Sequence, residues 1–115
     1  MRYFLTLLLV SVLLYGFVPL WWVFVPATAL AGYWLASSPL QGFAIGLGTH
    51  LLFVGISVAL LNESNDGILA YRIAGVLGLP SAFSMIAVTA VLHGLLGGLA
   101  GWGGALLQNK KRAVA

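Results

Sequence analysis

Long apolar stretches, separated by short polar or proline-containing breaks, run through most of this sequence. Residues 3–62 contain no charged side chain, and a second uncharged stretch runs from Pro80 to Leu107. A helix needs about 20 residues to cross roughly 30 Å of hydrocarbon. The first stretch is therefore long enough for up to three membrane spans, and the second stretch for one more.

Prolines and serines divide the first stretch. Proline is favourable at the start of a helix and unfavourable inside one, so we expect turns at Pro19 and at Ser37-Ser38-Pro39. These turns predict spans at about 3–17, 20–36 and 40–61, with the fourth at about 80–107. Pro26 then kinks the second span. Because the first two spans are short, we expect them to tilt little, to thin the bilayer, or to form a hairpin that does not fully cross.

The positions of the basic residues favour this division into four spans. Arg2 precedes the first span, and a cluster of two lysines and one arginine at 110–112 follows the last. Four spans place both on one side of the membrane, in agreement with the tendency of basic residues to stay in the cytoplasm. An alternative, with 3–25 as one kinked span and 27–36 as a re-entrant segment, would place them on opposite sides. We therefore expect both termini to be cytoplasmic.

One polar loop lies between the last two predicted spans. It has the sequence Asn-Glu-Ser-Asn-Asp-Gly at 62–67, and the mainly apolar segment after it is too short to cross a membrane. We expect residues 62–79 to form an outer loop with a short helix in the membrane interface, where Arg72 reaches lipid phosphate or the acidic residues of the loop. Trp21 and Trp22 are expected at the same outer interface, because tryptophan is enriched at that depth.

The composition argues against a soluble fold. Of the 115 residues, 62% are hydrophobic and 6% are charged, whereas a soluble domain is about half apolar and a quarter charged. We therefore expect a single integral membrane domain: an all-α bundle of four transmembrane helices plus a short interfacial helix, in a bacterial or archaeal plasma membrane. The chain has no cysteine, so thiolate metal sites are impossible, and no basic patch indicates nucleic-acid binding.

Glycines and one histidine recur along the third and the fourth predicted span. Spacings of three or four residues place them on one face of each helix, where glycine lets a second backbone approach closely. The glycines expected at this contact are Gly42, Gly46, Gly94, Gly97, Gly98, Gly101 and Gly104. We expect it to hold His50 and His93 near the membrane centre, with depths that differ by roughly 5 Å. Ser57 and Thr89 are among the hydrogen-bond partners expected for the two imidazoles.

Three functions are compatible with these patterns, and none of them is enzymatic. The only two acidic residues lie in the polar loop, so no catalytic carboxylate pair is expected inside the membrane. We first expect a packing or assembly component that forms a homo-oligomer or an accessory subunit of a larger membrane complex. The second possibility is an oligomeric channel or carrier with His50 and His93 lining the path. The third is an electron-transfer subunit that binds haem b through both histidines, although glycine-mediated packing leaves little space for the porphyrin.

Overall fold

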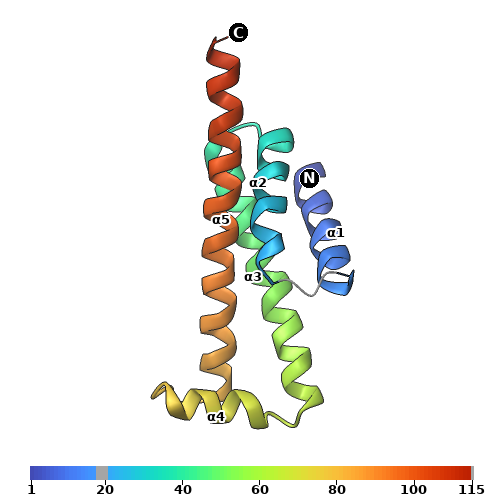
Figure 1. The fold of residues 1–115 in the computed structure, drawn as a ribbon. Helices are drawn as coiled ribbons and strands as arrows, with labels where there is room; N and C mark the ends of the chain where they lie inside the picture. Colours follow the sequence, from blue (N-terminus) through green and yellow to red (C-terminus); the bar gives the residue numbers. More distant parts are fainter. Residues whose placement is uncertain (18–20, 115) are drawn as a thin grey trace.

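The computed structural model describes residues 1–17 and 21–114, and this part of the chain consists of helices joined by turns, without a strand (Figure 1). Its elements are α1 (Arg2–Phe17), a short 3₁₀ helix (Trp21–Val23), α2 (Phe24–Leu35), α3 (Pro39–Ser64), α4 (Ile68–Val76) and α5 (Ala82–Val114). The all-α class expected from the sequence is therefore confirmed.

Two helices, rather than four, have the length and hydropathy of a membrane span. They are α3, with 26 residues, and α5, with 33 residues. The segments expected to span at 3–17 and 20–36 instead form α1, with 16 residues, and α2, with 12 residues. At 1.5 Å per residue these helices measure about 24 Å and 18 Å, less than the ~30 Å of hydrocarbon. The turn expected at Pro19 lies outside the described residues.

Short polar residues and proline define where the helices begin. The Ser38 hydroxyl accepts a hydrogen bond from the backbone N–H of Gln41, 3.2 Å away, and Pro39 occupies the first turn of α3. Ser81 caps the start of α5 in the same way, through the backbone N–H of Ser84. Pro26 lies in the first turn of α2 instead of at the mid-helix position expected for a kink. Proline is tolerated there because it removes no interior helical hydrogen bond.

The helices pack around α5. In Figure 1, α1 descends and α2 returns as a hairpin, α3 descends to the far end, and α5 runs back along α3 and past it. Helix α5 packs along both α3 and α2, whereas α1 packs against α2 and α3. The N- and C-termini therefore lie toward the same end of the molecule. The hairpin of α1 and α2 covers only the part of the α3–α5 pair nearest the termini.

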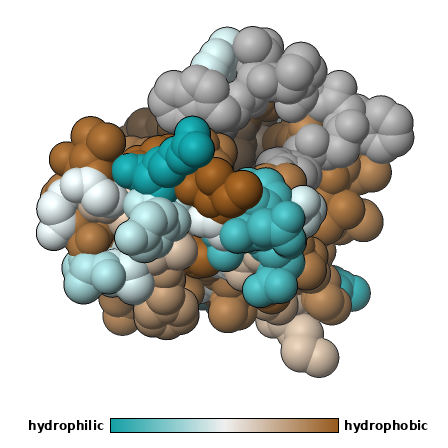
Figure 2. All heavy atoms as spheres, turned by 90° about the horizontal axis from the view of Figure 1, so that it is seen from below, coloured by the Kyte–Doolittle hydropathy of each residue, from teal (hydrophilic) through white to brown (hydrophobic). Residues whose placement is uncertain are grey.

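Helix α4 lies across the opposite end of the α3–α5 pair (Figure 1). Gly67 and Gly78, with φ of 71° and 69°, form the turns on either side of it, in a conformation that glycine adopts without steric cost. Figure 2 views the molecule from this end, where hydrophilic residues gather together and hydrophobic residues surround them. The acidic residues Glu63 and Asp66 and the base Arg72 belong to this end.

Candidate functional site

All four helices of the bundle meet at Gly101 in α5. A Cβ atom at Gly32 of α2 or at Gly42 of α3 would overlap the Gly101 carbonyl group. A Cβ atom at Gly101 would overlap the Gly42 carbonyl and lie 2.9 Å from the hydroxyl of Tyr3 in α1. Only glycine therefore fits at the three contact positions of α2, α3 and α5. We call this contact, together with the tyrosine of α1 that adjoins it, the glycine hub: Tyr3, Gly32, Gly42 and Gly101.

The other glycines that the sequence places at helix contacts lie along α5 on both sides of the hub. A Cβ atom at Gly46 would overlap the Gly97 carbonyl, and Cβ atoms at Gly94 and Gly98 would press on side chains of α3. Gly104 differs, since the atoms nearest to a Cβ there belong to Ala29 and Tyr33 of α2. The backbones of α3, α2 and α5 thus approach closely within one chain.

About two helical turns from the glycine hub, the corresponding positions of α1, α3 and α5 all carry polar side chains. The residues eight positions from the hub on α1, α3 and α5 are Ser11, His50 and His93. Eight helical residues measure about 12 Å, so these side chains form a second level in the bundle. Because His50 is eleven residues from the start of α3, this level lies about 17 Å along that helix.

Thr28 and Thr49 complete what we call the polar layer: Ser11, Thr28, Thr49, His50 and His93. All of them except His93 are buried, with exposed fractions between 0% and 5%, and they are the buried polar side chains of the described chain. His93 is half-buried. The Ser11 hydroxyl donates to the Leu7 carbonyl at 2.8 Å. The Thr49 hydroxyl, although enclosed, has no hydrogen-bond partner among the residues that the structure describes.

His50 is held by a threonine of the short helix α2. Its Nε2 atom lies 2.6 Å from the Thr28 hydroxyl, which in turn lies 2.7 Å from the carbonyl of Phe24. A carbonyl oxygen can only accept, so the hydroxyl donates its hydrogen to Phe24 and accepts one from Nε2. This assigns the ring proton of His50 to Nε2. The ring lies over Gly97, where a Cβ atom would overlap it.

His93 has the opposite tautomer. Its Nδ1 atom lies 2.9 Å from the Thr89 carbonyl, so Nδ1 carries the proton and donates it. The neutral ring then has a lone pair on Nε2, for which no hydrogen bond is found within the described chain. The ring of Phe24 packs against both imidazoles, with its centroid 4.8 Å from that of His50 and 5.7 Å from that of His93.

Of the two residues expected as hydrogen-bond partners of the histidines, Thr89 bonds to His93 through its backbone carbonyl, whereas Ser57 bonds to neither imidazole in the described structure. The Thr89 hydroxyl donates to the Met85 carbonyl at 2.9 Å, and Thr89 contacts His93 only through its backbone. Ser57 lies seven residues beyond His50, about 10 Å further along α3. Sequence reasoning did not single out Thr28, the residue that bonds to His50. Its only signal was a hydroxyl within an uncharged apolar stretch.

Trp22 lies near the polar layer rather than at the level of α4. It stands two residues before Phe24, whose ring contacts His93, and 51% of its surface is exposed. Helix α4 adjoins the start of α5 at Ala82, eleven residues or about 17 Å from His93. The expected position of Trp22 at the outer interface stays a prediction. The side chain of Trp21 is outside the described part of the chain.

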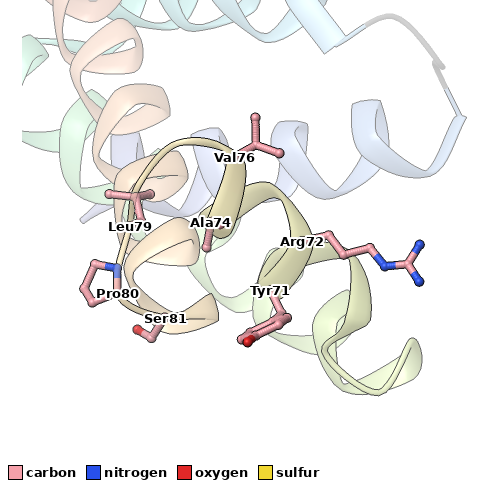
Figure 3. A pocket seen from close by; sticks show the side chains of 8 residues that line it. Tyr71, Arg72, Ala74, Val76, Leu79, Pro80 and Ser81 are labelled. Carbon is pink, nitrogen blue, oxygen red and sulfur yellow. The ribbon is translucent and has the colours of Figure 1, made fainter.

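Arg72 is an exposed residue of α4. Figure 3 shows its guanidinium group extending away from the pocket that forms between α4 and the start of α5. Tyr71, Ala74 and Ser81 are among the residues that line this pocket. Contact of Arg72 with lipid phosphate therefore stays a prediction.

Comparisons with protein-family models, with curated proteins and with solved structures found no match. Within the described residues, no group of three histidine or acidic side chains could hold a metal ion. Any function must therefore be inferred from the helix arrangement and the polar layer.

Proposed function

We propose that this protein is a small membrane assembly component that works as a homo-oligomer or as an accessory subunit of a larger membrane complex. In this proposal α3 and α5 cross the plasma membrane of a bacterium or archaeon. The α1–α2 hairpin enters from the cytoplasmic side and completes a four-helix bundle. Both termini, with Arg2 and the basic cluster at 110–112, then stay cytoplasmic, whether the hairpin stops inside the bilayer or crosses by thinning it.

One observation supports this proposal. One face of α3 is buried by other helices in its first half and is exposed in its second half, where we call it bare. Near the hairpin, Ile45 packs against the core and Thr49 is fully buried. Continuing along the same face, the exposed fractions of Leu52, Ile56 and Leu60 are 52%, 60% and 64%. This face has helical spacing throughout, so the change follows from the limited length of α1 and α2.

Lipid tails are as apolar as leucine, so exposure alone does not separate lipid from a protein partner, and the cross-linking experiment below distinguishes the two. The glycine faces are already used within the chain. We therefore place the contact with a partner on the bare face, which we define as Leu52, Ile56 and Leu60.

Cysteine cross-linking tests this proposal cleanly, because the natural chain has no cysteine. Ile56→Cys places a thiol on the bare face, and Leu9→Cys places one on the outer face of α1; both native side chains are 60% exposed. We expect oxidant to link Ile56→Cys into a dimer in native membranes and to leave Leu9→Cys monomeric. The measurement is a non-reducing gel, with the mass of the purified protein in detergent as a second readout.

The two variants have equal exposure, so random collisions would cross-link them equally. Equal yields, or a monomeric mass at all protein concentrations, would contradict the homo-oligomer. A cross-link from Ile56→Cys to a different protein, absent for Leu9→Cys, would support the accessory-subunit form of the proposal.

The polar layer favours a second candidate, an oligomeric channel or carrier with His50 and His93 lining the path. Ionisable side chains inside a membrane mark ion or proton routes in many proteins. If the route exists, His93→Ala should reduce proton flux in liposomes to the level of empty vesicles. Thr89→Val is the matched control, because it keeps the carbonyl that orients His93 and should keep the flux. Equal flux in both variants would reject the route.

No specific observation favours the third possibility, a haem b subunit. A haem bound through both histidines needs a porphyrin plane between their rings. In this structure the Phe24 ring packs against both, and Nε2 of His50 is bonded to Thr28.

A further inference from the structure

The half-buried imidazole of His93 has a property that the proposed assembly role does not use. Its Nδ1–H is bonded to the Thr89 carbonyl at 2.9 Å, so the free nitrogen of the neutral ring is an acceptor. His50, in contrast, is 2% exposed and its Nε2 is bonded to Thr28. Of the two imidazoles, His93 is therefore the one that can accept a hydrogen bond from a molecule outside the bundle.

The surroundings of His93 restrict the chemistry of such a molecule. The spans carry no charged side chain from residue 3 to 62 or from 73 to 109, so a charged ligand would have no counter-charge at this depth. The ligand must be neutral and soluble in lipid, and it must donate a hydrogen bond. The Phe24 ring, tilted by 35° to the imidazole with its centroid 5.7 Å away, provides an aromatic surface for a flat ring.

We propose that His93 and Phe24 form a site for a hydroquinone, the reduced form of a membrane quinone. A hydroquinone hydroxyl donates to Nε2 of His93, its ring packs beside Phe24, and its tail extends into the lipid. The oxidised quinone has carbonyl oxygens in place of the hydroxyls, so it cannot donate to this nitrogen. The site therefore binds the reduced form selectively. This inference does not depend on the proposed assembly role.

Imidazole ¹⁵N NMR of the full chain in lipid nanodiscs tests the site, because the protein has only two histidines. The probes are tetramethylhydroquinone and tetramethylquinone, which share one ring and differ in the hydroxyl hydrogens. We expect the hydroquinone to shift the Nε2 signal of His93 in the direction of an accepted hydrogen bond and to leave the His50 signals in place. The quinone should cause no such shift.

Two variants give an independent readout of binding. His93→Phe keeps an aromatic ring, removes the acceptor, and should weaken hydroquinone binding by about ten-fold, the loss of roughly one hydrogen bond. Trp34→Phe, at an exposed position near the other end of α2, should bind as the natural protein does. Equal shifts from both probes, a shift at His50 only, no shift at saturation, or a response to a sterol alcohol alone would each overturn the proposal. None of these outcomes bears on cross-linking at Ile56.

Discussion

Replacing Gly101 by alanine is expected to destabilise the bundle strongly. The new Cβ atom would overlap the Gly42 carbonyl and lie 2.9 Å from the Tyr3 hydroxyl. The Gly42 carbonyl belongs to the backbone, so α3 and α5 would have to move apart along their whole contact. Overpacking of this kind costs roughly 1–3 kcal/mol, and more where backbone cannot move. Unfolding in a titration from mild detergent to dodecyl sulfate, followed by circular dichroism, measures the loss.

Gly103→Ala is the matched control. Gly103 lies two residues further along the same helix, and a Cβ atom there has no neighbour within 4 Å. Alanine is a better helix former than glycine by about 1 kcal/mol, so this variant should be as stable as the natural protein or slightly more stable. If the two variants were equally stable, the convergence of four helices at Gly101 would be wrong.

The sequence predicted the long helices and the similar level of the two histidines along the bundle for simple geometric reasons. A stretch without charge that is long enough to cross a bilayer almost always forms helix, because lipid offers no partner to the backbone. Once α3 and α5 run in opposite directions with their glycines facing, helical rise alone puts His50 and His93 near one level. These inferences need only residue spacing, and so they do not depend on side-chain detail.

The short hairpin could not be predicted in the same way. In α1 and α2 nearly every residue is apolar, so no periodic contrast distinguishes the side facing lipid from the side facing protein. Apolar length alone also could not show that α2 begins near His93. The role of Thr28 depends on a partner 22 residues away, and the role of Gly101 on contacts with three separate helices. Both are properties of the tertiary arrangement.

Two buried threonines of the polar layer should respond in opposite ways to the same substitution. Thr28→Val and Thr49→Val each replace a hydroxyl by a methyl group of nearly equal size, at positions with 0% exposure. Thr28→Val leaves the Nε2–H of His50 enclosed without its acceptor. A buried donor without a partner costs roughly 1–3 kcal/mol, so we expect a loss of stability in this range. Thr49→Val removes a hydroxyl that is unpaired in the described structure and should be neutral or stabilising.

The difference between these two variants, measured in the same detergent titration, also tests whether the layer is dry. Valine cannot bond to water, so a water molecule held by the Thr49 hydroxyl would be lost in Thr49→Val, and its cost would approach that of Thr28→Val. Such a result would contradict an unpaired hydroxyl and would place water at mid-depth between α1, α2 and α3, beside His50. Water there would support a proton route. If Thr49→Val is as stable as the natural protein and Thr28→Val is less stable, the polar layer serves helix packing. His50 is then a structural side chain, and His93 is the member of the layer that is open to the surroundings of the bundle.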